Sequence, residues 1–514
     1  LIGFMAIAAC GCGQKQSDNP LLNEFTTPYG IAPFEEITID NYREGILLGM
    51  EEQKAEIEAI INNPEEPTFQ NTIVAMDQSG KLLRKVRGTF SPLTSSNSTE
   101  ESRALEKELS PLMSAHSDDI NLNEKLFARV KKVYDNRENI KLTPEEKTVL
   151  ENIYKRFVNS GAELSETEKE KLRELNQQLS MLELTFSQNL LHETNNTFVV
   201  ANSLEELKGL PQANIDAAAK MAADNGQPGK WMFNMQRPSC NPVLQYCENR
   251  DLRKKVYDAY YNRGNTGNEY DSKEICRQLV TLRLEKAKLM GYNNYAEMVL
   301  EDRMAKTPEA VFELLDQVWE PAVAKAKEEL DDIRAEIRKE GKDFEPAGWD
   351  YMYYLDKAKR AKYSVDEQEI REYMEINNVM KGVFHVATQL YGVTFKEITA
   401  DVPAYEPTAK AYEVIDKDGT VLAIFYSDNY PRESKRAGAW CTSFRGQSYD
   451  GEERIIPIVV NSTNMTAPTG DGPALQSIDN VETLFHEISR DFMKGAPSPT
   501  ARSAMVVSSV SPER

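Results

Sequence analysis

Apolar side chains at helical spacing run through most of the chain, and this pattern constrains the fold more than any other feature. The longest run alternates spacings of three and four residues, which is typical of a narrow packing seam between helices. It consists of Leu172, Leu175, Leu179, Leu182 and Phe186. Ser165 and Glu168 precede it at the spacing of a capping box. The pattern predicts a mainly α-helical protein.

One region is rich in β-branched and aromatic residues instead. Residues 412–415 and 421–426 flank Asp416-Lys417-Asp418-Gly419, a sequence typical of a hairpin turn. Residues 438–443 and 455–461 supply further short strands. We therefore predict one small antiparallel β-sheet between about residues 412 and 462, next to the helix that follows.

That helix carries a His-Glu pair. Asp479 is the expected N-cap, and Glu482 stands where it would close a capping box. His486-Glu487 is the first half of the HExxH signature, in which two histidines one turn apart bind zinc and the glutamate is the general base. Position 490, where the second histidine belongs, holds Arg490. A lone His-Glu pair on an amphipathic helix is more often structural than catalytic.

The sequence around this helix favours the catalytic interpretation. A turn-rich loop, residues 461–475, leads into the helix, and Lys435-Arg-Ala-Gly-Ala-Trp440 lies upstream. Together with VETLFHE at 481–487, these runs resemble the thimet oligopeptidase and peptidyl-dipeptidase family of zinc peptidases. The resemblance extends from about residue 20 to residue 487 and includes stretches at 249–253 and 349–354. The stretches at 19–22 and 27–33 resemble the peptidyl-dipeptidase branch.

The resemblance implies two helical lobes flanking a channel that admits short peptides, with one zinc ion per site. His486 would bind the metal, and Glu487 would accept a proton from the zinc-bound water. Gly438, Ala439 and Trp440 would bind an extended peptide through main-chain hydrogen bonds. For Trp440, ordinary core packing remains an equal alternative. The implied reaction is the release of C-terminal dipeptides.

After residue 487 the sequence departs from the family pattern. Arg490 has no lone pair to donate to a metal and stays protonated. The family's third zinc ligand is a glutamate, and only Glu513, close to the end of the chain, has roughly the right separation. The family's carbonyl-polarising groups would lie beyond residue 514, which suggests a C-terminal truncation. We expect a chain with this sequence to be inactive; the alternative is a non-catalytic helical envelope lipoprotein or a peptide-binding pseudo-enzyme.

The N-terminus has the features of a lipoprotein signal. Residues 1–9 are apolar, and Ile7-Ala-Ala-Cys10 resembles a bacterial lipobox. The motif predicts lipidation of Cys10 and a location on the periplasmic side of the bacterial cell envelope. Modification of Cys12 and a degenerate signal without lipid remain open, as does a cytoplasmic location, which some family members have.

Composition limits the partners. The formal net charge of −21 argues against a nucleic-acid-binding surface, which needs clustered Lys and Arg. We expect a monomer that contacts a membrane only through its lipid anchor. The cysteines at 240, 247, 276 and 441 show no CxxC spacing, which disfavours a structural zinc but leaves disulfide pairing open.

Four regions are predicted. They are a signal and polar tether at 1–19, an N-terminal helical region at 20–226, an incomplete zinc-peptidase catalytic region at 227–487 and an aberrant tail at 488–514.

Overall fold

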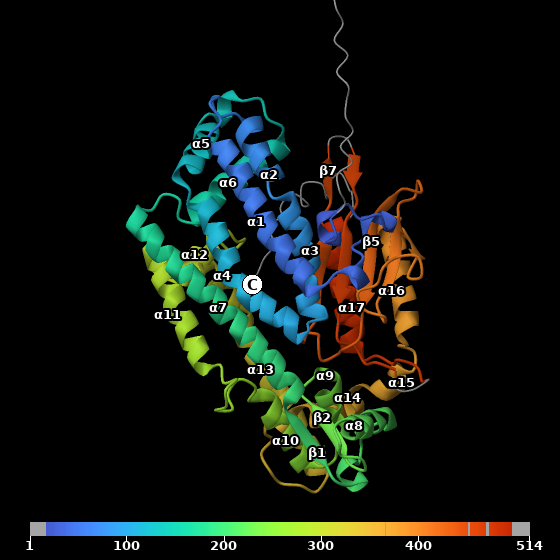
Figure 1. Ribbon diagram of the computed structural model, residues 1–514. Coiled ribbons are helices and arrows are strands. Elements are labelled where there is room, and N and C mark those ends of the chain that lie inside the picture. Colours follow the sequence, from blue (N-terminus) through green and yellow to red (C-terminus); the bar gives the residue numbers. More distant parts are fainter. Residues whose placement is uncertain (1–16, 365, 451–452, 469–471, 496–514) are drawn as a thin grey trace, which may run out of the picture.

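The computed structural model describes residues 17–364, 366–450, 453–468 and 472–495, without the side chains of residue 450 and residues 489–495. The expected lipidation site Cys10 and the candidate ligand Glu513 lie outside these residues, as does the side chain of Arg490. The described chain is mainly helical (Figure 1), which confirms the predicted fold class.

The first two hundred residues form helices that pack on one another. They are α1 (Ile39–Ile61), α2 (Ala75–Gln78), α3 (Lys81–Ser96), α4 (Glu100–Asn121), α5 (Glu124–Asp135), α6 (Pro144–Asn159) and α7 (Glu166–Asn196). Side-chain caps define their starts: Thr38 and Thr143 each accept a hydrogen bond from the backbone amide three residues on. At the start of α7, the Ser165 amide donates to the Glu168 carboxylate over 2.9 Å. The capping box predicted there is confirmed.

The middle of the chain forms a second group of helices, most of which lie in the lower part of Figure 1. They are α8 (Gln212–Asp224), α9 (Arg237–Tyr246), α10 (Arg250–Tyr261), α11 (Lys273–Leu289), α12 (Tyr295–Leu300), α13 (Pro308–Lys339), α14 (Gly348–Tyr363), α15 (Glu367–Arg371) and α16 (Ile376–Tyr391). A two-stranded antiparallel sheet of β1 (Phe198–Ala201) and β2 (Trp231–Asn234) packs against α8. Helices α9, α10 and α14 contact one another.

Within the described part of the chain, five strands form one sheet in the order β3-β4-β5-β9-β6. They are β3 (Thr394–Glu397), β4 (Lys410–Ile415), β5 (Val421–Asp428), β6 (Trp440–Arg445) and β9 (Ile458–Ser462), and a separate hairpin joins β7 (Ser448–Asp450) to β8 (Glu453–Ile455). The predicted hairpin is confirmed as β4 and β5. The expectation of a purely antiparallel sheet is wrong, since β5 pairs with β9 in parallel. Between β5 and β9 the chain forms β6 and the β7–β8 hairpin, and β9 therefore runs in the same direction as β5.

The last described helix, α17 (Ile478–Gly495), packs against β6, β9 and α16. Its Leu484 and Ile488 side chains are 0% and 2% exposed and belong to the apolar core between sheet and helices. The helix begins one residue before Asp479, and the Ser477 hydroxyl accepts a hydrogen bond from the amide of Asn480 over 3.2 Å. The prediction of Asp479 as N-cap is therefore wrong, because Ser477 occupies the capping position two residues earlier.

Candidate active site

Gly438 and Ala439 line one cavity together with the first turns of α17. This cavity, called here the α9–α17 cavity, has a volume of about 450 Å³. Its other walls come from α9, α14, α15 and residues 463–466. In Figure 1, α9, α14 and α15 lie below the five-stranded sheet and α17. The segment of Gly438 and Ala439, which the family resemblance assigns to peptide binding, thus meets α17, the helix that it assigns to catalysis, at the α9–α17 cavity.

The predicted site residues occupy different positions around this cavity. Gly438 is exposed with φ at +97°, and Ala439 is half-buried. Trp440 does not line the cavity: it begins β6, is 8% exposed and packs beneath the Arg436 guanidinium, 4.3 Å from its ring centroid. Trp440 therefore has the surroundings of a packed side chain.

His486 and Glu487 follow Thr483, a cavity-lining residue, by three and four positions on α17. Residues at these spacings share one face of a helix. His486 is exposed, whereas Glu487 is only 5% exposed. The His-Glu pair therefore stands one turn beyond the cavity wall, on the face that contributes Thr483.

The residues present do not fit a catalytic zinc site. Among the described residues, no three His, Cys, Asp or Glu side chains come together as a group that could hold a metal ion. Position 490 lies one turn after His486 on α17 and carries an arginine, which cannot ligate a metal. Catalytic zinc needs three protein ligands, and the described residues offer His486 alone from the family pattern.

A buried ion pair fixes the segment that presents Gly438 and Ala439. The Lys435 ammonium donates to Oδ1 and to the carbonyl oxygen of Asp428, both over 2.8 Å, and to the carbonyl of Tyr430. The Lys435 and Asp428 side chains are both 0% exposed. Burial lowers the pKa of Lys435 to about 8, although the Asp428 carboxylate opposes the shift. The segment is therefore tied to the end of β5 by a paired charge that water does not reach.

The same segment is joined to the first group of helices. The Ser98 amide donates to the Ser434 carbonyl over 2.9 Å, and the Arg436 amide donates to the Ser95 carbonyl over 3.0 Å. From α7, the Asn195 side-chain amide donates to the carbonyl of Glu433 over 2.8 Å. These bonds hold the cavity wall in place relative to α3, α4 and α7.

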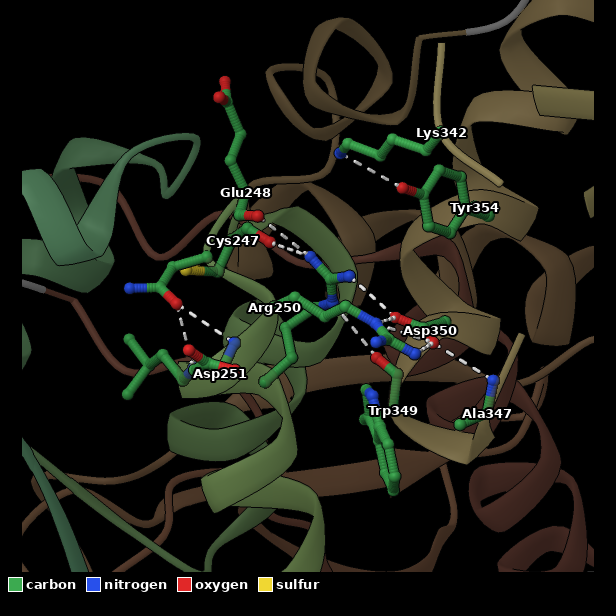
Figure 2. Close-up of polar contacts among 12 residues, drawn as sticks. Cys247, Glu248, Arg250, Asp251, Lys342, Ala347, Trp349, Asp350 and Tyr354 are labelled. Atoms are coloured by element: carbon green, nitrogen blue, oxygen red, sulfur yellow. Dashed lines mark hydrogen bonds and ion pairs between the residues drawn. The ribbon is translucent and has the colours of Figure 1, made fainter. Parts of the chain in front are cut away.

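A second buried ion pair aligns the opposite wall, formed by α9 and α14. Figure 2 shows the Arg250 side chain directed at Asp350, with Nη2 and Oδ2 2.7 Å apart. Arg253, which is 1% exposed, approaches the same carboxylate at 2.9 Å and also donates to the carbonyls of Cys247 and Trp349. Burial raises the pKa of Asp350, but hydrogen bonds from both arginines and from the Ala347 amide lower it below its usual value. The α9–α10 junction is thereby bonded to the first turn of α14.

Comparison with known proteins agrees with this architecture. Residues 243–491 match the model of Peptidase family M3. The chain is 36% identical over 470 residues to the dipeptidyl carboxypeptidase of Escherichia coli K12, and the match covers 91% of this chain and 69% of that protein. The chain belongs to peptidase family M3. It is thus a metallopeptidase by family, as predicted.

Other M3 relatives are oligopeptidases. The chain is 30% identical over 474 residues to oligopeptidase A of Haemophilus influenzae Rd, covering 91% of this chain and 69% of that protein. It is also 30% identical over 484 residues to an organellar oligopeptidase A of Arabidopsis thaliana, covering 92% and 60% respectively. These matches confirm the expected thimet oligopeptidase and peptidyl-dipeptidase relationship.

Sequence reasoning missed the charged residues of the cavity. Four cationic and three acidic side chains line it: Arg237, Lys359, Arg371, Lys435, Asp356, Glu367 and Asp479. They come from α9, α14, α15, α17 and the segment before β6, so no local spacing relates them. Asp350 and its arginine partners could have been predicted, because residues 249–253 and 349–354 both resemble M3 segments.

Proposed function

We propose that the α9–α17 cavity binds short peptides and that the reaction of an intact M3 site of this kind is the release of C-terminal dipeptides. The observation that carries the proposal is the meeting of Gly438 and Ala439 with the first turns of α17 at one cavity. The name of the Escherichia coli relative, dipeptidyl carboxypeptidase, supports the choice of product.

In this proposal the backbone at Gly438 and Ala439 pairs with the main chain of an extended peptide. Strand β6 follows directly and lies at the edge of the five-stranded sheet, which is where a peptide can add as a further strand. Glu487 is the residue that the signature assigns to proton acceptance. The ion pairs behind both walls keep the cavity preformed, which lowers the cost of ordering on binding.

We further propose that a chain with Arg490 binds peptides but does not hydrolyse them. An arginine at position 490 has no lone pair to offer a metal and stays protonated, so a positive charge stands in the sequence where the family pattern has a zinc ligand. One imidazole cannot replace three protein ligands. The arginine at position 490 therefore favours the interpretation that this chain is a peptide-binding pseudo-enzyme.

Metal content and turnover test the proposal together. The purified 514-residue chain would be dialysed with zinc, analysed for bound metal and incubated with an N-terminally blocked peptide, with dipeptide release followed by mass spectrometry. We expect substoichiometric zinc and no release. Arg490→His should raise zinc binding with little or no activity, because losses within one catalytic unit are not additive. Stoichiometric zinc with measurable turnover in the unaltered chain would refute inactivity, and Glu513→Gln would then show whether Glu513 is the missing ligand.

We also propose that the protein is a monomeric lipoprotein of the cell envelope, attached through Cys10, with short peptides and no nucleic acid as partners. Among the described residues, no helix combines the length and apolarity needed to cross a bilayer. Mass spectrometry of the protein from its native host should find Cys10 at the N-terminus and lipid-modified. An unmodified Cys10, or retained residues 1–9, would contradict the proposal.

A further inference from the structure

Four cationic and three acidic side chains line the α9–α17 cavity, in a protein whose formal net charge is −21. Because Asp428 neutralises Lys435 behind the wall, the charge that a ligand meets depends on the individual side chains and not on a net positive lining. The question is which of the cations have donors left for a ligand.

Two of the four cations are already engaged by other side chains. The Lys435 ammonium is paired with Asp428 behind the wall. The Arg237 guanidinium bonds to the Tyr260 hydroxyl and interacts with the charge of Asp479, and both raise its pKa above its usual value.

Arg371, at the end of α15, is different. Its Nη2 donates to the carbonyl of Leu475 over 3.0 Å, while its Nε is buried and has no hydrogen-bond partner among the described residues. No carboxylate of the described chain lies within ion-pair distance of it. A guanidinium carries five N–H donors in a planar fork that matches a carboxylate, so Arg371 keeps most of its capacity. Its bond to the loop before α17 fixes its position in the wall.

Lys359, on α14, lines the same cavity, is exposed and has no ion-pair partner among the described residues. The neighbouring acids are engaged elsewhere. Asp356 pairs with Arg360 at 2.8 Å, and Glu367 accepts a hydrogen bond from Gln245 over 2.8 Å. The cavity therefore contains two cations that a ligand can use.

We infer that Arg371, assisted by Lys359, binds the free C-terminal carboxylate of a peptide in the α9–α17 cavity. The inference rests on the proposed peptide-binding function and adds the residue that selects free C-termini. When Arg371 holds the C-terminal carboxylate, it limits how many peptide residues lie between the catalytic helix and the C-terminus of the peptide. A cavity of about 450 Å³ lies within the range of about 300–1,000 Å³ that small-ligand sites occupy. Arg371 is thus a specificity residue for peptides with a free C-terminus.

Direct binding tests this without turnover. Fluorescence anisotropy would measure the Kd of an N-terminally fluorescein-labelled tetrapeptide for the 514-residue chain, as the free acid and as the amide. We expect the acid to bind about tenfold more tightly or better, as one charge-assisted contact allows. Arg371→Gln should bring the ratio close to one by weakening the binding of the free acid. Arg371→Lys should keep part of the ratio, and Lys359→Gln should lower it about threefold.

The matched control is Arg338→Gln, which removes the same charge from the exposed end of α13, outside the cavity. It should leave the ratio unchanged. A third peptide, a C-terminal amide whose last residue is aspartate, distinguishes recognition of the C-terminal carboxylate from recognition of a side-chain carboxylate. Circular dichroism would verify that the Arg371 variants fold.

Equal affinity of acid and amide for the unaltered chain would overturn the inference, as would a ratio retained in Arg371→Gln. So would an aspartate amide that binds like the free acid. Failure of both peptides to bind would instead refute the proposed peptide-binding function itself, so the two failures are distinguishable.

Discussion

Removal of the Asp350 charge should destabilise the protein strongly. Asp350→Asn keeps the shape of the side chain but leaves the guanidinium of Arg253, which is 1% exposed, without its carboxylate. Breaking a buried ion pair by neutralising one partner costs about 3–5 kcal/mol. Arg253→Met should cost at least as much, because the carbonyls of Cys247 and Trp349 also lose their donor.

Arg250→Gln is the matched control for the same carboxylate. The Arg250 side chain is 40% exposed, so solvent screens its contribution to about 1 kcal/mol or less. Urea unfolding at pH 7, followed by circular dichroism and by tryptophan fluorescence, would give the free energies. The expected order of destabilisation is Arg253→Met, then Asp350→Asn, then Arg250→Gln.

The pH dependence gives an independent check. The pKa of Asp350 is lower in the folded protein than its usual value of 3.8, so the unfolded chain binds the proton more readily. Its contribution is complete above pH 3.8 and is lost as the pH falls through the folded pKa. The stability difference between the unaltered chain and Asp350→Asn should therefore shrink below pH 3.8. A difference under 1 kcal/mol at pH 7, or Arg250→Gln as damaging as Asp350→Asn, would refute the reasoning.

Three further predictions test other parts of the site. Gly438→Ala forces an alanine into φ +97° and should cost about 1–2 kcal/mol in urea unfolding and weaken peptide binding, whereas Gly446→Ala should do neither. Ser477→Ala should cost about 1 kcal/mol through loss of the α17 cap, and Asp479→Ala clearly less; the reverse order would restore Asp479 as the cap. Because the pKa of Lys435 is about 8 when folded and its usual value is 10.5, the unfolded chain binds more protons between these pH values. The unaltered chain should therefore gain stability relative to Lys435→Met from pH 8 to 10.5, and parallel pH profiles in urea titrations would contradict this.

Local patterns predicted the secondary structure well where one short signal decided it. The hairpin of β4 and β5 follows from the Asp-Gly turn, and Gly419 has the positive φ of +89° that such a turn needs. The start of α17 was harder, because Ser477 and Asp479 are both good caps two residues apart. Only the observed hydrogen bond from Asn480 decides between them.

Burial was less predictable than helicity. The helical spacing of Leu314, Leu315 and Val318 predicts the helix that α13 forms, yet these side chains are 54–62% exposed. Periodicity states that a helix has an apolar face but not what covers it. The parallel pairing of β5 with β9 was missed for a related reason: strand order depends on long-range packing.

The cavity cations show the same limit at the site. Arg371 and Lys359 lie on different helices and belong to no motif, so only the fold brings them together. The His-Glu pair, by contrast, was found because HExxH is local to one helix turn. Chemistry encoded within one turn of helix is visible in the sequence, whereas recognition assembled from several elements is not.

Peptide binding and zinc binding should therefore be separable in this chain. The carboxylate contact depends on α14 and α15, and the buried charges that align both walls are paired, at Asp350 and at Asp428. Position 490 lies on α17, one turn after His486, and belongs to neither of these elements. Arg371→Gln should thus abolish the preference for free acids without changing zinc content, and Arg490→His should raise zinc content without changing that preference. Sites that share no contacts add independently, so the double variant should show both effects at full size. A changed acid-to-amide ratio in Arg490→His would mean that the guanidinium reaches into the cavity, and that recognition and metal binding share one site.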